Sequence, residues 1–351
     1  MRRPSARRGT LATAALLLVP ALAACGADPD TDSGAATGSG DGSASAEAFP
    51  VTVAHKYGET TVEEEPQRVV TVGLVEQDAL LALDVVPVAA TKWFGEAPGA
   101  IFPWATDRLG DAELPTVLDG TNGIRVEKVA SLEPDLIVGL YSGMTEQEYT
   151  LLSKIAPTVA QPEEYVDFGV PWDEATLTVG KVVGKPDEAQ ELVEEVTGRI
   201  EQAAQEHPEF EGKTAAVVTP YEGVWVYGPQ DPRGRLLDQL GFTFPAELRE
   251  EETDDFGWSI SAERTDDLGA LDTVVWLDLG NADAGMTRLW EGTAAAEEGR
   301  FLDISDDSGS YYVAHSMVTP LSIPYVLDRY VPQLAAAVDG DPATEPPAVT
   351  D

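Results

Sequence analysis

The chain has 351 residues, 43% of them hydrophobic, and a formal net charge of −40 at pH 7. That length allows two domains of ordinary size, each with a real core. The acidic excess excludes nucleic acid as a partner, because that role needs clustered positive charge, and it also excludes a polybasic contact with a membrane. It further disfavours a strongly anionic ligand.

The first 25 residues are predicted to be a lipoprotein signal peptide. Four arginines precede an apolar run from Leu11 to Leu22, which is followed by Ala-Ala-Cys25. Roughly 20 apolar residues are needed to cross a bilayer, so this run is too short for a spanning helix. Cys25 is the single cysteine, so no internal disulfide can form and we expect lipidation of Cys25. The Arg7-Arg8 pair leaves both the general secretory route and twin-arginine export open.

Residues 26–48 are rich in Gly, Ala, Ser and Asp and are expected to form a flexible tether. Alternating side chains from Phe49 onward predict a β-hairpin. Strands then alternate with helices, which indicates parallel β-α-β units. Strands are predicted at 68–73, 87–91, 135–138, 157–160, 214–218, 273–277 and 300–304, and helices at 76–83, 145–155, 173–183, 233–241, 288–298 and 325–338. Segments 94–118 and 311–324 are expected to be irregular.

A longer helix is predicted to open at Pro186 and to run to about Gln205, with its apolar residues on one stripe at helical spacing. At about 1.5 Å per residue it is roughly 30 Å long, enough to join two lobes. The predicted fold class is therefore α/β, with two Rossmann-like lobes with central parallel sheets joined by one long interlobe helix. The expected boundaries are 49–172 for the N-terminal lobe, 173–206 for the helical region, 207–338 for the C-terminal lobe and 339–351 for a disordered tail.

Two stretches share one layout, GIRVEKVASLEPDLIVGL at 123–140 and ISAERTDDLGALDTVVWLDL at 260–279. Each has a glutamate near a predicted helix start, a turn that contains an aspartate, and a β-branched strand. The glutamates are Glu127 and Glu263, and the aspartates are Asp135 and Asp272. The repeated layout indicates two similar lobes.

Four segments occur in order along the chain: RVVTVGLVEQDALLALDVVPVA, VEKVASLEPDLIV, LLSKIAPTV and WSISAERTDDLGALDTVV. Together they resemble the solute-binding lipoproteins of iron-siderophore ABC importers, the class III periplasmic binding proteins in which a helix joins two α/β lobes. The resemblance runs from about Arg68 to Leu334. It implies that the protein captures a ferric siderophore and delivers it to an ABC permease dimer with its ATPase. We expect a monomer on the outer face of the cell membrane, with no cofactor, no metal site of its own and no catalytic activity.

In that family one glutamate at the tip of each lobe docks into basic pockets on the permease, and the matching positions here are Glu127 and Glu263. A carboxylate in the first turn of a helix is stabilised by unpaired backbone N–H groups while it stays exposed. Ser261 is a natural N-cap for the second helix. Arg125 is a departure, because the family usually has a capping residue there, so Asn122 becomes a candidate cap for the first helix.

The ligand site is expected in the cleft between the lobes, outside the carboxyl ends of the parallel strands. Aromatic side chains on loops that follow strands suit a wrapped ferric chelate, which presents an apolar, hydrogen-bonding shell. The candidates are Trp93, Tyr141, Trp225, Tyr227, Trp258, Tyr311 and Tyr312, with Arg233 as a donor to anionic chelating oxygens. Because these loops carry few cations, we expect a neutral or cationic hydroxamate chelate and not a triply anionic catecholate.

Haem and cobalamin also fit an aromatic cleft and remain alternative ligands. Haem could take an axial ligand from Tyr141, Met144 or His315. The other two histidines of the chain, His55 and His207, are predicted to lie too far from such a cleft to complete a zinc or manganese site.

A secreted serine hydrolase is the alternative from a different class. Ser142 follows a predicted strand, and His315 with Asp303 could complete a catalytic triad. The local sequence Gly-Leu-Tyr-Ser-Gly differs, however, from the G-x-S-x-G turn of such enzymes. A polar turn is the simpler interpretation of Ser142.

Overall fold

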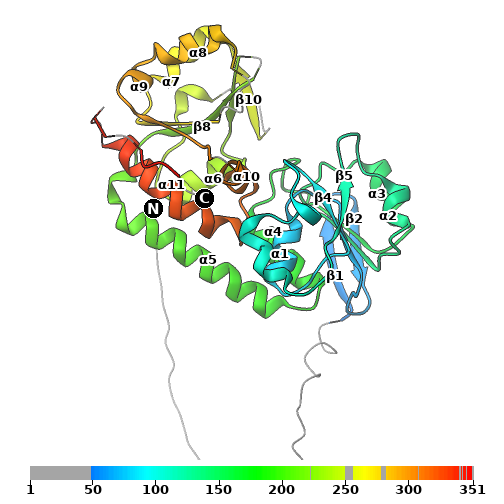
Figure 1. Cartoon of the computed structure of the whole chain (residues 1–351). Coiled ribbons are helices and arrows are strands. Elements are labelled where there is room, and N and C mark those ends of the chain that lie inside the picture. Colours follow the sequence, from blue (N-terminus) through cyan, green and yellow to red (C-terminus); the bar gives the residue numbers. More distant parts are fainter. Residues whose placement is uncertain are drawn as a thin grey trace, which may run out of the picture. The chain divides into compact units, whose positions relative to one another are not determined.

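The computed structural model describes residues 49–221, 223–249, 256–277, 282–306, 308–339, 341, 343–344 and 346–349 (Figure 1). These residues belong to one compact unit. The predicted signal peptide, tether and lipidation site at Cys25 lie outside the described residues. Within the described ranges, none of the helices is both long and apolar enough to span a membrane.

The N-terminal lobe contains a parallel five-stranded sheet in the order β5-β4-β3-β6-β7. Its strands are β3 (Val69–Thr71), β4 (Ala89–Lys92), β5 (Thr116–Asp119), β6 (Leu136–Gly139) and β7 (Thr158–Ala160). The helices α1 (Glu76–Ala82) and α4 (Trp172–Val182) pack on one face, and α2 (Val126–Ala130) and α3 (Glu146–Leu152) on the other. The predicted hairpin is confirmed as antiparallel β1 (Val51–His55) and β2 (Gly58–Val62).

The C-terminal lobe has a second five-stranded sheet in the order β10-β9-β8-β11-β12. Its strands are β8 (Ala215–Pro220), β9 (Val224–Tyr227), β10 (Gly257–Ile260), β11 (Thr273–Trp276) and β12 (Phe301–Asp303). Strands β8, β11 and β12 are parallel neighbours, whereas β9 runs antiparallel to both β8 and β10. The expectation of two α/β lobes with mainly parallel sheets is confirmed, and a hairpin replaces one crossover in this lobe.

The paired aspartates explain why the two lobes share a sequence layout. Asp135 lies just before β6 and accepts hydrogen bonds from the backbone N–H groups of Gln67 and Arg68, both at 2.8 Å. Asp272 lies just before β11 and accepts from the backbone N–H of Thr214, also at 2.8 Å. In each lobe the aspartate therefore fastens the start of the fourth strand, β6 or β11, to the start of the central strand, β3 or β8.

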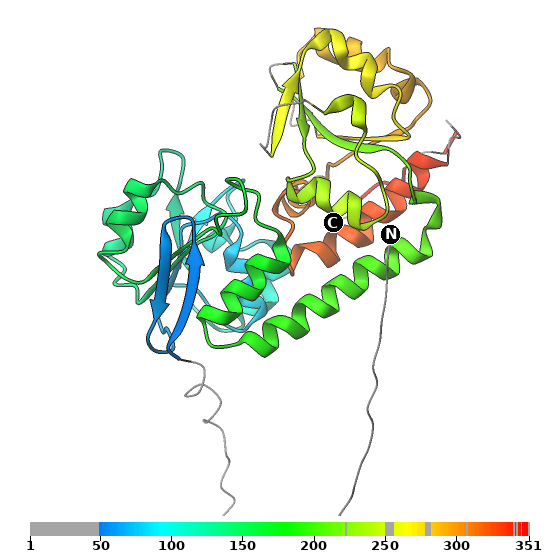
Figure 2. The same cartoon turned by 180° about the vertical axis from the view of Figure 1, so that it is seen from behind.

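The long helix α5 (Pro186–Glu206) packs against α4 of the N-terminal lobe and against α6 (Pro232–Gln239) and α11 (Ser322–Val338) of the C-terminal lobe. Both views of the chain show α5 running alongside both lobes (Figures 1 and 2). Its buried residues recur at helical spacing along one side, as the apolar stripe predicts. The expected interlobe helix is thus present.

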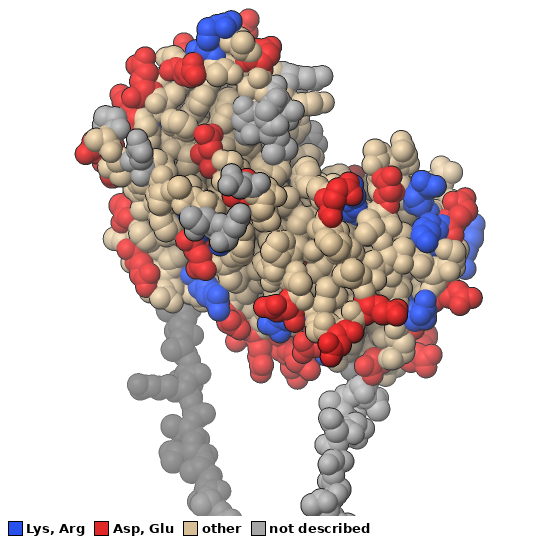
Figure 3. Space-filling view, in the orientation of Figure 1, with Lys and Arg blue, Asp and Glu red and all other residues tan. Residues whose placement is uncertain are grey.

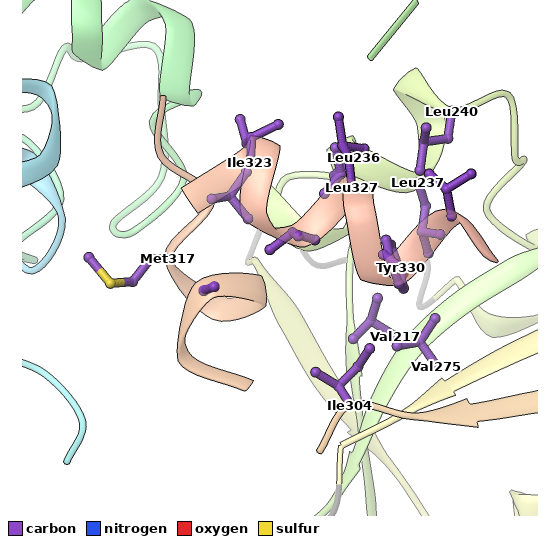
Figure 4. Packing of buried hydrophobic residues seen from close by; sticks show 14 of the residues in the cluster. Val217, Leu236, Leu237, Leu240, Val275, Ile304, Met317, Ile323, Leu327 and Tyr330 are labelled. Atoms are coloured by element: carbon purple, nitrogen blue, oxygen red, sulfur yellow. The ribbon is translucent and has the colours of Figure 1, made fainter. Parts of the chain in front are cut away.

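The core of the C-terminal lobe forms where α11 lies between α6 and the sheet. Leu327 and Tyr330 of α11 lie between leucines of α6 and the strand residues Val217 and Val275 (Figure 4). Tyr330 and Leu334 are fully buried. The other face of this sheet is covered by α7 (Thr265–Leu268), α8 (Ala284–Glu291) and α9 (Ala294–Glu297).

The lobes also touch through polar contacts. The buried Asp78 carboxylate of α1 accepts hydrogen bonds from the Trp104 indole N–H at 2.7 Å and from the Thr319 hydroxyl at 2.5 Å. Trp104 belongs to the short helix η3 (Pro103–Leu109), and Thr319 lies between α10 (Ser310–Met317) and α11. The Arg235 guanidinium of α6 donates to the Gly169 carbonyl of the N-terminal lobe.

Several expected boundaries were wrong. Segment 311–324, expected to be irregular, contains α10 and the first turn of α11, and segment 94–118 contains η2 (Pro98–Ala100), η3 and the start of β5. The helix predicted at 288–298 is two helices, α8 and α9. The predicted disordered tail contacts the lobe where it is described, because Gln333 donates to the Pro347 carbonyl at 3.2 Å and Val349 packs on the core. The remaining short helices are η4 (Pro208–Phe210), η5 (Ala246–Leu248) and η6 (Ala262–Arg264).

Candidate ligand-binding site

Eight aromatic side chains from both lobes form one continuous set of ring contacts, here called the aromatic band. In order of contact they are Tyr312, Phe94, Trp93, Tyr141, Phe168, Phe256, Trp225 and Tyr227, with neighbouring ring centroids between 4.8 and 6.5 Å apart. The band crosses between the lobes at the Phe94–Tyr312 and Phe168–Phe256 contacts, at 5.5 and 6.3 Å. The aromatic band thus forms one apolar surface with hydrogen-bonding edges, to which both lobes contribute.

In the N-terminal lobe the band residues come from loops at the carboxyl ends of strands. Trp93 and Phe94 directly follow β4, and Tyr141 lies two residues beyond the end of β6. Phe168 has a positive φ of 60°, a left-handed conformation that is unfavourable for a bulky residue. That backbone turn places the Phe168 ring against Gly143, where a Cβ would come within 2.8 Å of the ring.

In the C-terminal lobe the band residues Trp225 and Tyr227 come from one strand. Alternate side chains of a strand point to opposite faces, so Val224 and Val226 enter the core while Trp225 and Tyr227 point the other way. Tyr312 lies on α10 and is 8% exposed.

Arg233 lies directly beneath Tyr227, with its guanidinium carbon 3.6 Å from the ring centroid. The guanidinium donates to both carboxylate oxygens of Asp231, at 2.8 and 2.7 Å. Burial alone would lower the pKa of Arg233, but the adjacent Asp231 carboxylate raises it above its ordinary value. Arg233 is 4% exposed, so its charge is already balanced within the protein. The expectation of a free ligand-facing cation at this position therefore needs correction.

Glu76 holds Tyr141 from behind. Its carboxylate is 1% exposed and accepts hydrogen bonds from the backbone N–H of Tyr141 at 2.7 Å and of Val75 at 3.2 Å. Burial raises the pKa of Glu76, and these backbone hydrogen bonds oppose the shift. Gly73 leaves the space for this carboxylate, since a Cβ on Gly73 would lie 2.0 Å from it. Glu76 thus ties the loop after β3 to the loop after β6.

Two cavities adjoin the band, and the space-filling view shows the molecular face hollowed between the lobes (Figure 3). One, of about 530 Å³, is lined by segment 94–106 of the N-terminal lobe and by segment 308–313 of the C-terminal lobe. The other, of about 340 Å³, lies within the N-terminal lobe and includes Phe168, Ser142 and Arg125 in its lining. Each volume lies within the range of about 300–1,000 Å³ that is usual for small-molecule sites.

Two predicted contact residues lie in the core. Tyr311 is fully buried, and its hydroxyl donates to Gln333 at 2.9 Å. Trp258 is 9% exposed, packs in the core of the C-terminal lobe and donates its indole N–H to the Leu248 carbonyl at 2.9 Å. These two assignments are corrected, because their polar atoms are used internally.

Three band residues were missed by sequence reasoning. Phe94 follows a strand just as Trp93 does, so the same rule could have found it. Phe168 lies in the loop between β7 and α4, so the same rule could have found it too. Phe256 directly precedes β10, outside the loops that follow predicted parallel strands, and only its ring contacts identify it.

The glutamates at matching positions are both exposed. Glu127 lies in the first turn of α2, whose N-cap position is Arg125 with no side-chain cap, so the suggested cap at Asn122 was wrong. Glu263 lies in η6 after Ser261. A backbone hydrogen bond and the Ser261 hydroxyl lower the pKa of Glu263, so Ser261 contacts the glutamate without capping the helix.

The residues of the hydrolase alternative are not assembled as a triad. The Ser142 hydroxyl donates to the Gly139 carbonyl at 2.9 Å and accepts from the Met144 N–H at 3.1 Å. His315 is fully buried on α10, burial lowers its pKa to about 3, and neither ring nitrogen has a partner among the described residues. Such a histidine is not placed to take a proton from Ser142.

The sequence matches the periplasmic binding protein family over residues 69–307. It is 29% identical over 208 residues to the Fe(3+) dicitrate-binding periplasmic protein FecB of Escherichia coli, a match covering 57% of this chain and 64% of that protein. It is also 29% identical over 220 residues to the probable siderophore-binding lipoprotein YfiY of Bacillus subtilis, covering 61% and 64%. The matched region thus spans somewhat under two thirds of either curated relative.

Solved structures share the whole fold. A periplasmic solute binding protein from Mycobacterium smegmatis is 34% identical and superposes with a TM-score of 0.70, over 82% of this chain and 98% of that one. PiaA from Streptococcus pneumoniae in complex with ferrichrome is 27% identical with a TM-score of 0.71, over 83% and 99%. With the family match extending through both lobes, this chain belongs to the periplasmic binding protein family.

Proposed function

We propose that the protein is the extracytoplasmic solute-binding component of an ABC importer and that it captures a ferric siderophore between its lobes. The aromatic band is the observation that carries this proposal, because it offers a largely apolar wall with hydrogen-bonding edges to an already saturated metal complex. Relatives whose names record binding of ferric dicitrate and ferrichrome support the ligand class. The protein is proposed to perform no reaction and to act as a monomer.

A hydroxamate chelate is the favoured ligand, and haem or cobalamin is the alternative. The internal pairing of Arg233 with Asp231 leaves little free positive charge at the band, which disfavours a triply anionic catecholate. Tyr141, considered as a haem ligand, is 3% exposed, and burial raises the pKa of its hydroxyl above its ordinary value. A neutral phenol is a poorer axial ligand than a phenolate.

Tryptophan fluorescence titration tests this proposal. Ferrichrome, a ferric catecholate, haem and cobalamin would be added to the purified protein, with quenching expected from ferrichrome. Trp93→Phe and Trp225→Phe should reduce the quenching, whereas Trp290→Phe, in the C-terminal core, should not. Tight binding of the catecholate alone would refute the hydroxamate preference, and no binding of any ferric chelate would refute the function.

Glu127 and Glu263 are proposed to dock into basic pockets of the permease. Both are exposed and lie at equivalent places in the two lobes. Replacing both by Ala should abolish uptake in cells while leaving chelate affinity unchanged. Persistent uptake would disprove this assignment.

The protein is proposed to be held at the outer face of the cell membrane by a lipid on Cys25. The sequence motif and the lipoprotein relative YfiY support this anchor. Radiolabelled fatty acid should label the wild-type protein in cells and not a Cys25→Ala variant. Equal labelling of both would exclude Cys25 as the anchor.

A further inference from the structure

Arg125 occupies an unusual position at the start of α2. It is the N-cap residue of that helix, yet its side chain makes no capping hydrogen bond, and arginine is not among the residues that favour this position. The helix start is instead supported from α3, because the Glu148 carboxylate accepts the backbone N–H of Ile124 at 3.0 Å. The Arg125 side chain is therefore released from a structural role at the helix start.

The same side chain lines the cavity of about 340 Å³ in the N-terminal lobe. That cavity lies at the carboxyl ends of β3, β4, β5 and β6 and meets the aromatic band at Phe168. Positively charged side chains gather on this end of the lobe near α2 (Figure 3). Arg125 is the single cationic residue in the lining of this cavity within the described part of the chain.

The acidic groups of the cavity are already engaged by the protein. Asp119 accepts the backbone N–H of Thr121 at 2.9 Å, and Glu148 accepts the N–H groups of Ile124 and Thr145. No hydrogen bond or ion pair of the Arg125 guanidinium occurs among the described residues. Hydrogen bonds from Thr121 lower the pKa of Asp119, and the nearby Arg125 charge adds a smaller contribution in the same direction. Five guanidinium N–H donors thus remain for a ligand.

We infer that Arg125 is a specificity-determining residue that recognises an anionic oxygen of the ferric chelate from the N-terminal lobe. This inference rests on the proposed function and narrows it. The chelate lies along the aromatic band with its neutral shell and directs one oxygen, from the metal-binding groups or from a free carboxylate, into the cavity below Phe168. The planar guanidinium can also reach the second oxygen of the same hydroxamate or carboxylate group, because it donates two parallel hydrogen bonds.

The single positive charge of Arg125 also limits the negative charge that the bound chelate can carry. One arginine balances one negative charge, so a chelate with an overall charge near zero or −1 matches this cavity better than a triply anionic one. A second anionic group would meet Asp119 and Glu148. The chemistry of the cavity thus agrees with the hydroxamate preference, and a chelate with one free carboxylate fits as well.

Titration of matched variants tests the inference. Arg125→Ser removes the cation and restores a favoured capping residue, Arg125→Lys keeps the charge without the fork, and Lys128→Ser removes an exposed cation of α2 outside this cavity. Each full-length protein would be titrated with ferrichrome and with a ferric trihydroxamate that carries one free carboxylate, and its Tm measured. Arg125→Ser should weaken binding about 10- to 100-fold, the loss expected for one charged hydrogen-bonding partner, with a Tm no lower than wild type.

The affinities of Arg125→Ser for the two chelates show which oxygen of the chelate Arg125 binds. Loss of ferrichrome affinity would indicate oxygens of the metal shell, and loss confined to the carboxylate-bearing trihydroxamate would indicate a free carboxylate. The inference is overturned if Arg125→Ser binds both chelates within about twofold of wild type, or if Lys128→Ser loses as much affinity. A wild-type protein that binds no ferric chelate at all refutes the proposed function, and the inference falls with it. A wild-type protein that binds only the triply anionic catecholate overturns the inference while the proposed function stands.

Discussion

The buried Asp78 carboxylate, which accepts hydrogen bonds from both lobes, should make the stability of the protein depend on pH. The carboxylate is fully buried, and its contacts come from Trp104 of its own lobe and Thr319 of the other. Its second oxygen has no partner among the described residues. Burial raises the pKa of Asp78 to about 6, while the two hydrogen bonds oppose that shift.

The raised pKa has a definite consequence for stability. An unfolded aspartate has a pKa of about 3.9, so between about pH 4 and pH 6 the folded protein holds a proton that the unfolded chain has lost. Stability from this group is therefore fully present below about pH 4 and is lost as the pH rises through about 6. A difference of about two pH units corresponds to about 3 kcal/mol.

Asp78→Asn removes the titration while keeping an oxygen that can accept one of the two hydrogen bonds. Urea unfolding of wild type and variant should be measured at several values between pH 4 and pH 7.5. The free energy of unfolding of the variant relative to wild type should rise by about 3 kcal/mol across this range, because contributions from other carboxylates cancel in the difference.

Thr319→Val serves as a second variant, since it removes the hydroxyl donor to Asp78. It should destabilise the protein more at pH 7.5 than at pH 4, because the ionised carboxylate then keeps only Trp104 as a donor. A difference between wild type and Asp78→Asn that stays constant with pH would refute the reasoning. A difference that falls with rising pH would show that the hydrogen bonds outweigh burial.

The remaining predictions concern the core and the supports of the site. Leu334→Ala, at a fully buried position of α11, should lower the free energy of unfolding by about 2–5 kcal/mol, measured by urea titration; a loss below about 1 kcal/mol would contradict the packing. Gly73→Ala should displace the Glu76 carboxylate, costing about 1–3 kcal/mol and weakening chelate binding; unchanged affinity would show that Glu76 does not position the Tyr141 loop. Burial alone would raise the pKa of Asp272, but hydrogen bonds from Lys213 and Thr214 lower it. The stabilisation by Asp272 should therefore be lost as the pH falls below about 4. The free energy of unfolding of Asp272→Asn should fall less steeply than that of wild type over this acidic range, and an equally steep fall would contradict the prediction.

The strand and helix order was predictable where one face of an element is buried. Helix α5 has its apolar residues at helical spacing, and its bounds match the expectation to within a residue or two. Helix α10 could not be found in this way, because all eight of its residues are buried and a helix buried on every side shows no periodic contrast. Strand β5 buries a single side chain, Leu118, and so gives too weak an alternation.

The aromatic character of the candidate ligand site was predictable from the sequence, but the particular residues that form it were less so. Trp93 and Tyr141 belong to the aromatic band and follow β4 and β6, as the rule for loops after strands predicts. Trp225 and Tyr227 also belong to the band, but they lie within the strand β9 and not on the expected loop. Tyr311 shares that position in the sequence, but on α10 it points into the core. The Arg233–Asp231 pair is formed by residues two apart, yet only the structure shows that both are buried and bonded to each other.

The pairing of β9 on both sides makes the two walls of the candidate ligand site unequal in stiffness. Trp225 and Tyr227 stand on a strand paired on both sides, to β8 and to β10, so their positions are fixed by two ladders of backbone hydrogen bonds. Trp93, Phe94 and Phe168 stand on loops, which adapt more readily than strands. Chelates with different substituents should therefore contact the same surface of the C-terminal lobe, while the N-terminal loops adjust their conformation to each chelate.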